Sequence, residues 1–181
     1  QEMLYAIREI KQRGLIKGHD TFPVYVDSPL AVEATSIFLQ CDESNFDEET
    51  LAVIRQGINP IWFDGVTLSV SSEESKAVNF DARPKVILSA SGMCEAGRIR
   101  HHLKHNLWRG ESIILFVGYQ AEGSLGRKLQ NGAKAVRLFG EDIAVRAKIV
   151  NFQGLSSHAD HDHLIDWIKH FDPARTTHVF V

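Results

Sequence analysis

One pattern constrains the fold of this chain more than any other. A short β-rich apolar run leads through a loop of small residues into a helix pattern, and this happens three times. The three pairs of strand and helix are 22–27 with 30–39, 85–88 with 97–107, and 112–117 with 125–130. Such alternation is typical of α/β proteins, whose ligands bind beyond the carboxyl ends of the strands. The sequence therefore predicts a Rossmann-like, mostly parallel sheet with flanking helices.

The remaining segments give weaker signals for further elements. An amphipathic helix is expected at 1–14, where Met3, Leu4, Ile7 and Ile10 fall on one stripe. Other expected elements are a helix at 49–57, a strand at 67–70, a helix at 71–77 capped by Ser71 or Ser72, a strand pair at 135–140 and 143–152, and a strand at 177–181. A last helix within 155–171 should place Leu164, Ile165, Trp167 and Ile168 inside.

Composition narrows the classes of function. The chain has 181 residues and a formal net charge of −3, so it is not a strongly basic nucleic-acid binder, and any contact with nucleic acid must be local. Cys41 and Cys94 form no CxxC pair and are interpreted as reduced thiols of a cytoplasmic protein. The longest apolar run, at 113–117, is far too short to cross a bilayer.

The first candidate site is the loop SASGM at 89–93 together with the start of the following helix. Small residues such as Ser89, Ser91 and Gly92 allow close approach of a ligand, helix amides attract an anion, and Arg98 can grip a phosphate through two nitrogens. The alternative is a tight turn followed by a solvated basic helix face. The loop is neither GxGxxG nor a Walker loop, so nothing indicates a dinucleotide or ATP.

Two more segments carry candidate chemistry. In GYQAEGSLG at 118–126, the glycines are interpreted as serving backbone geometry rather than ligand contact. In SSHADHDH at 156–163, a histidine near a helix start can be a general acid or a metal ligand, and a serine can bond a substrate oxygen. For His161 and His163, exposure in the first helical turn is the favoured interpretation, with Asp160 as a cap.

Five segments together carry a resemblance that composition could not show. They are QEMLYAI, VYVDSPLA, ILSASGMCEAGRIRHHLKH, FVGYQAEGSLGRKL and LSSHADHDHLIDWI. In this order the chain resembles the metallo-β-lactamase/β-CASP nucleases, and within them the cleavage-and-polyadenylation endonuclease branch with its prokaryotic ribonuclease relatives. The resemblance implies a hydrolase that acts on RNA, with single-stranded RNA as partner.

The resemblance also implies a mechanism and a set of site residues. Two zinc ions lie between the lactamase-like domain and the β-CASP domain, and a metal-bound hydroxide attacks the scissile phosphate. His158 matches the motif B histidine and would donate a proton to the leaving oxygen, with Ser156 as a hydroxyl of the phosphate pocket. The SASGM loop and Arg98 would line the RNA path. The metal ligands themselves are expected outside this sequence.

On the same grounds we expect a piece of a longer protein, inactive alone and without zinc of its own. Residues 1–147 would be the β-CASP domain, truncated at its N-terminal side, and 148–181 the return into the lactamase-like domain. A homodimer of the parent is a further expectation. The alternative function is a non-catalytic RNA-binding or scaffold paralogue with the same fold, which altered zinc ligands would reveal. A Rossmann-like small-molecule binder conflicts with the missing phosphate fingerprint.

Overall fold

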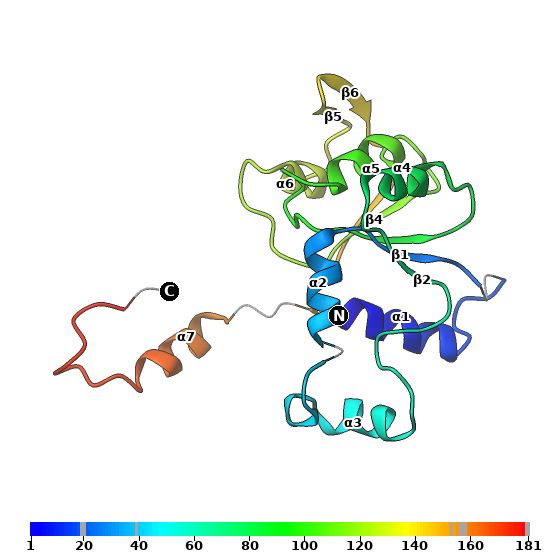
Figure 1. Cartoon of the computed structure of the whole chain (residues 1–181). Coiled ribbons are helices and arrows are strands. Elements are labelled where there is room, and N and C mark those ends of the chain that lie inside the picture. The colour runs from blue at the N-terminus through cyan, green and yellow to red at the C-terminus, as the bar shows by residue number, and fades with distance from the viewer. Residues whose placement is uncertain (19–20, 39, 153, 156–158, 180–181) are drawn as a thin grey trace.

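The computed structural model describes residues 1–18, 21–38, 40–152, 154–155 and 159–179 (Figure 1). Its helices are α1 (Glu2–Gln12), α2 (Pro29–Phe38), the 3-10 turn η1 (Glu43–Asn45), α3 (Glu48–Arg55), α4 (Ser72–Phe80), α5 (Ile99–Asn106), α6 (Leu125–Gln130) and α7 (His161–Ile168). Its strands are β1 (Val24–Val26), β2 (Val66–Leu68), β3 (Val86–Leu88), β4 (Ile113–Phe116), β5 (Ala135–Leu138), β6 (Glu141–Ala144) and β7 (Lys148–Asn151).

The predicted α/β architecture with parallel strands is confirmed. The first sheet has the order β2-β1-β3, and Val24 pairs in parallel with Val66 on one side and with Val86 on the other. Figure 1 shows α1 and α2 on one side of these strands and α4 and α5 on the other. A second parallel pair, β4 with β7, forms a separate sheet. The third strand–helix unit therefore does not add a strand to the first sheet.

The first hydrophobic core forms where α1 packs on β1. Leu4 and Ile7 come from the predicted stripe of the helix, and they meet Val24 and Val26 of the central strand. Because β1 is covered on both faces, these two valines are almost fully buried, at 0% and 2% exposure. Burial of each such side chain contributes about 1.5–3 kcal/mol, so this contact fixes the helix against the strand whose end carries the site below.

The second core joins α5 and α6 to the strands β4 to β7. Leu103 and Leu107 of α5 pack with Phe116 of β4, Leu129 of α6 and Leu138 of β5. These five side chains are nearly or fully buried. The hairpin β5–β6 is thereby attached to the helices that follow the two glycine-rich loops.

The predicted second strand at 143–152 is wrong as a single element. Its first part belongs to β6, which is antiparallel to β5, and its second part is β7, which is parallel to β4. Between them the amides of Arg146 and Ala147 both donate to the carbonyl of Leu107, at 2.8 and 2.9 Å, and that of Val145 donates to Lys134. These donors face α5 and the turn before β5, so the ladder breaks there.

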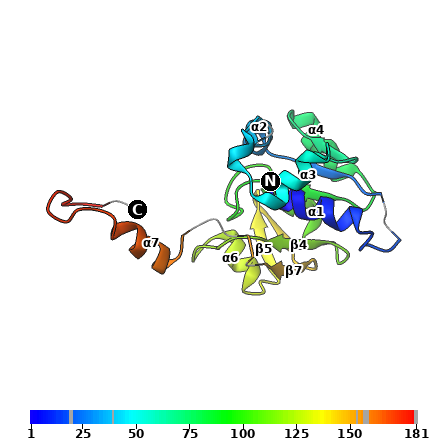
Figure 2. The same ribbon diagram turned by 90° about the horizontal axis from the view of Figure 1, so that it is seen from below.

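The expectation for the last helix is also wrong in part. α7 is shorter than predicted, and Ile165, Trp167 and Ile168 are 41%, 50% and 36% exposed rather than inside. Figures 1 and 2 both show α7 apart from the other elements, so within the described residues none of them covers its apolar stripe. Residues 177–179 of the predicted final strand are not in a strand, and 180–181 lie outside the described residues. No helix in the described ranges is long and apolar enough to span a membrane.

Candidate functional site

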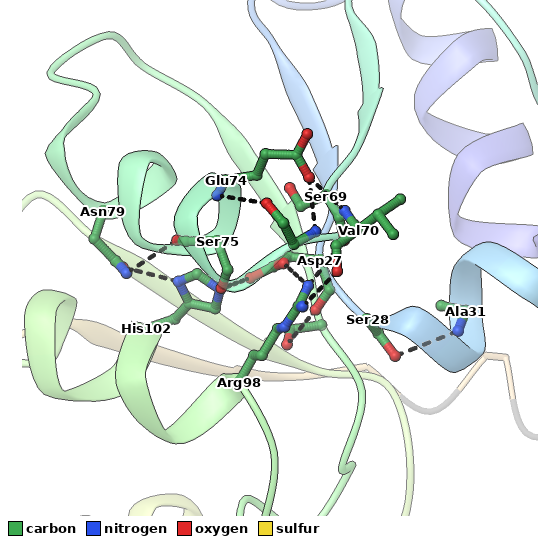
Figure 3. A network of polar contacts seen from close by, with 12 residues as sticks. Asp27, Ser28, Ala31, Ser69, Val70, Glu74, Ser75, Asn79, Arg98 and His102 are labelled. Atoms are coloured by element: carbon green, nitrogen blue, oxygen red, sulfur yellow. Dashed lines mark hydrogen bonds and ion pairs between the residues drawn. The ribbon is translucent and has the colours of Figure 1, made fainter.

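Strand β1 is followed directly by a fully buried carboxylate, Asp27. Its amide donates to the carbonyl of Leu88 at 2.8 Å, and its carbonyl accepts from the Ser89 hydroxyl at 3.0 Å, so β1 stays joined to the end of β3. Figure 3 shows three side chains converging on the carboxylate. The Ser75 hydroxyl donates to Oδ2 at 2.6 Å, Arg98 Nη1 donates to Oδ1 at 2.8 Å, and Nε2 of His102 contacts Oδ2.

Arg98 links the start of α5 to the ends of two strands. Besides Asp27, its Nη1 donates to the carbonyl of Ser69 and its Nη2 to that of Val70, both at 2.8 Å. Its side chain is only 19% exposed, while that of Asp27 is 0% exposed. Both terminal nitrogens of Arg98 therefore already donate within the protein, and its expected contact with phosphate stays a prediction.

His102 is a buried member of this network that the sequence reading missed. A solvated basic helix face, the alternative interpretation of this stretch, does not hold for His102, which is 4% exposed. Its Nδ1 lies 2.8 Å from Oδ1 of Asn79. Burial lowers the pKa of His102, and the opposing effect of Asp27 is smaller. Because the carboxylate of Asp27 can only accept, the neutral ring donates from Nε2, and Arg98 supplies the charge that matches Asp27. Nδ1 then accepts, so the amide of Asn79 must present its NH2 group rather than Oδ1 to the ring. The spacing of Arg98 and His102, one helical turn apart, was the available signal.

Helix α4 brings the other two polar side chains to the network. Its N-terminus is the predicted cap at Ser71, whose hydroxyl accepts from the amide of Glu74 at 3.1 Å. The Glu74 carboxylate in turn accepts from the amide of Ser71 at 2.8 Å, which completes a capping box. With the helix start fixed, Ser75 and Asn79 lie one turn apart on the face toward Asp27 and His102.

The SASGM loop keeps its shape through its own hydrogen bonds. Ser91 has a left-handed φ of 71°, and its hydroxyl accepts from the amide of Ala96 at 3.2 Å. Gly92 is exposed, and a Cβ added to it would meet nothing within 4 Å. The loop therefore presents an open backbone surface at Gly92, while Ser89 and Ser91 are committed to hydrogen bonds within the protein.

The two glycine-rich loops are joined to each other. Nε2 of buried Gln120 donates to the carbonyl of Gly92 at 2.8 Å, and the amide of Gly126 donates to that of Met93 at 3.1 Å. A Cβ on Gly126 would lie 1.6 Å from Oε1 of Gln120, so a larger residue here would displace that buried side chain. The amide of Leu125 at the start of α6 donates to the Glu95 carboxylate. The loops thus form one connected surface.

The third candidate segment is described only in part. Ser156 and His158 lie outside the described residues. His161 and His163 are exposed and lie beside carboxylates, with Nδ1 of His163 2.8 Å from Asp160. Asp160 also accepts from the amide of His163 at 2.9 Å, so it is the N-cap of α7, as expected. Within the described ranges no three His, Cys, Asp or Glu side chains could hold a metal, so a zinc ion does not fit the residues seen there.

Comparison with known families decides the identity of this arrangement. Residues 1–129 match the model of the Beta-Casp domain, and residues 142–181 match that of the Zn-dependent metallo-hydrolase RNA specificity domain. The chain belongs to the β-CASP family. The resemblance to β-CASP metallo-β-lactamase-type nucleases is therefore confirmed, whereas the domain boundary expected at 147 stays a prediction.

Three relatives show how this β-CASP chain compares with longer proteins. It is 40% identical over 171 residues to ribonuclease TTHA0252 of Thermus thermophilus, 93% of this chain and 38% of the relative. It is 31% identical over 179 residues to the transcription termination factor FttA of Methanocaldococcus jannaschii, 96% of this chain and 27% of that protein. An RNase J-like protein of the same organism is 29% identical over 169 residues, 93% of this chain and 37% of its own length. The chain thus spans well under half of each relative.

Proposed function

We propose that this β-CASP chain is the substrate-clamping part of a zinc-dependent ribonuclease that hydrolyses phosphodiester bonds of single-stranded RNA. The observation that carries the proposal is the 40% identity, over 93% of the chain, to a protein named as a ribonuclease. The geometry supports it, because the two glycine-rich loops form one connected surface with Gly92 open to solvent. The buried Asp27 network holds this surface against the sheet.

In this proposal the chain binds and orients RNA, and zinc supplies an activated water when bound. The described residues offer no set of three ligands, so the two expected ions would need ligands from elsewhere in the protein. His158 would hold the proton that the leaving oxygen takes, and Ser156 would bond a phosphate oxygen, as the family motif implies. The loop that contains Ser89, Ser91 and Gly92 would contact the backbone of the RNA. Because Arg98 donates to Asp27, its contribution would be mainly to position this loop.

The proposed setting is a reducing one, the cytoplasm. Cys41 is exposed and Cys94 is buried, and both are free thiols. Burial raises the pKa of Cys94 to about 11, so this thiol stays protonated and unreactive at neutral pH. An exposed free cysteine such as Cys41 is typical of proteins that reducing compartments keep unoxidised.

A second candidate function is RNA binding without cleavage, as part of a factor that acts on transcription. The observation that favours it is the name of the archaeal relatives, transcription termination factor, which match 96% of this chain at 31% and 32% identity. Both candidates share the RNA surface and differ only in whether the metal centre is complete.

The test uses the full-length protein that contains this chain. His158→Ala should lower turnover on labelled single-stranded RNA by roughly 10²-fold or more, because a general acid is lost. RNA affinity should change little. The matched control is His161→Ala, whose ring is exposed on α7 and which should cleave at the wild-type rate. Equal rates for His158→Ala and wild type would remove His158 from the mechanism, and a wild type that binds but never cleaves RNA would favour the second candidate.

A further inference from the structure

A groove on the far side of α5 from Asp27 has no role in the site described so far. It lies between the start of α5, helix α6 and strand β5, and its cavity has a volume of about 350 Å³. We call it the α6–β5 groove. Its charged lining consists of Glu95, Arg100, Lys128 and Arg137, over an apolar floor that includes Leu125 and Val136.

The charges of the α6–β5 groove are unbalanced. Among the described residues, Arg100, Lys128 and Arg137 form no ion pair, although Asp142 is the cross-strand neighbour of Arg137. The groove's own carboxylate, Glu95, already accepts from the amide of Leu125. The lining therefore carries three cations and one carboxylate, with Asp142 beside Arg137, in a chain whose net charge is −3. Such a local excess of positive charge attracts an anion.

Arg100 gives a second, independent indication of a ligand. Its guanidinium carbon lies 5.0 Å from the centroid of the Phe139 ring, which holds the side chain in place. Within the described residues the one hydrogen bond of its side chain runs from Nη1 to the carbonyl of Glu95 and is long, at 3.4 Å. In the described structure its Nε is buried without a hydrogen-bond partner. A buried donor left unpaired is unfavourable, and an acceptor oxygen from a ligand would pair it.

The two arginines at the start of α5 thus have different tasks. Arg98 donates to the carboxylate of Asp27, just after β1, and to the carbonyls of Ser69 and Val70, just after β2. Arg100 is two residues later, so it points to the other side of the helix, toward α6 and β5. Arg100, Lys128 and Arg137 offer a second place for a phosphate, besides the contact predicted for Arg98.

We propose that the α6–β5 groove binds backbone phosphates of the RNA strand. The proposal rests on the proposed function, since it takes RNA as the ligand. Glu95 at the edge of the groove is three residues after Gly92, so the groove adjoins the SASGM loop along the chain. Three donors of this kind neutralise up to three phosphates and carry no base specificity.

The test compares variants of the full 181-residue chain in equilibrium binding to labelled single-stranded RNA at several salt concentrations. Replacement of Arg100, Lys128 and Arg137 by Gln should weaken binding at least ten-fold. It should also reduce the slope of log affinity against log salt by about 2, since each phosphate contact contributes about 0.7 on single strands. A double variant, Lys128→Gln with Arg137→Gln, should show about two thirds of that change and alters only exposed side chains.

The matched control carries the same change of charge elsewhere. Lys17, Arg55 and Lys76 are exposed and lie outside the groove, and their replacement by Gln should leave the salt slope within about 0.5 of wild type. Equal losses in control and groove variants, or none in either groove variant, would overturn the groove while leaving the proposed function intact. A wild-type chain that binds no RNA would overturn both. Stabilisation by inorganic phosphate without any binding of RNA would overturn RNA as the ligand of this groove.

Discussion

At the scale of single residues, Asp27 has the most demanding environment in the site. Desolvation of a carboxylate costs several kcal/mol and is offset only where donors surround the charge. Ser75, Arg98 and His102 provide those donors, and none of them is adjacent to Asp27 in sequence. The stability of the site therefore depends on contacts between elements that only the fold brings together.

We expect Asp27→Asn to lower the free energy of unfolding by about 3–5 kcal/mol, because it leaves the charge of Arg98 without its partner. The control is Glu141→Gln, which removes a surface pair with Lys104 and should cost at most about 1 kcal/mol. Urea denaturation followed by circular dichroism measures both. Similar losses for the two variants would show that the Asp27 network does not anchor the sheet.

His102 gives the fold a dependence on pH. Burial lowers its pKa, so just below the ordinary value of 6.5 the unfolded chain binds more protons than the folded chain. The contribution of His102 is therefore fully present above about pH 6.5 and is lost as the pH falls below it. We expect the free energy of unfolding to decrease between pH 6.5 and 5. His102→Gln should flatten that slope in urea titrations, and an identical slope in the variant would contradict this assignment.

How much of the site the sequence could predict is clear from these residues. SASGM and Arg98 stand out as a motif, and the expected strand–loop–helix geometry around them is present. The partners of Arg98 could not be predicted, since Asp27 and Arg98 are 71 residues apart and Asp27 and His102 are 75 apart. Local pattern gives the faces of a helix, whereas the element that covers each face depends on the order of strands in the sheet.

At the scale of elements, the loops are as informative as the helices. Gly126→Ala should lower stability by about 1–3 kcal/mol, because the new Cβ displaces the buried side chain of Gln120 and breaks its bond to the SASGM loop. Gly92→Ala is the matched control, since its Cβ enters open space, and it should change stability by no more than about 0.5 kcal/mol. Thermal unfolding compares them, and equal melting temperatures would show that the loops are not coupled.

Helices and strands were predictable to different degrees for a physical reason. Helix α1 was recognisable from its apolar stripe and helix α4 from its N-terminal cap. Both signals are local in the sequence, and the structure has both features. The break between strands β6 and β7 at 145–147 could not be recognised, because the amides of Arg146 and Ala147 donate to the carbonyl of Leu107, which is far away in sequence. The apolar stripe of α7 predicted burial, yet the stripe has no cover in the described structure. A pattern shows which face is apolar, and the rest of the molecule determines what meets it.

At the scale of the whole molecule, the chain has two hydrophobic cores and a local cluster of positive charge, an arrangement that suits a protein that binds RNA. One core anchors α1 and the central strand, and the other anchors both helices that follow the glycine-rich loops. The chain is net acidic, so its cations are effective only where they gather, as in the α6–β5 groove. Binding should accordingly be modest and sensitive to salt.

The side chains available for zinc lead to a prediction for the 181-residue chain purified alone. A catalytic zinc needs three protein ligands plus water, each oriented by further hydrogen bonds. In the described ranges no such set exists, and His161 and His163 lie exposed beside Asp162 and Asp160. We therefore expect much less than one zinc per chain by elemental analysis and no hydrolysis of labelled single-stranded RNA. Stoichiometric zinc with metal-dependent cleavage, abolished by His158→Ala, would show that the chain carries a complete active site of its own.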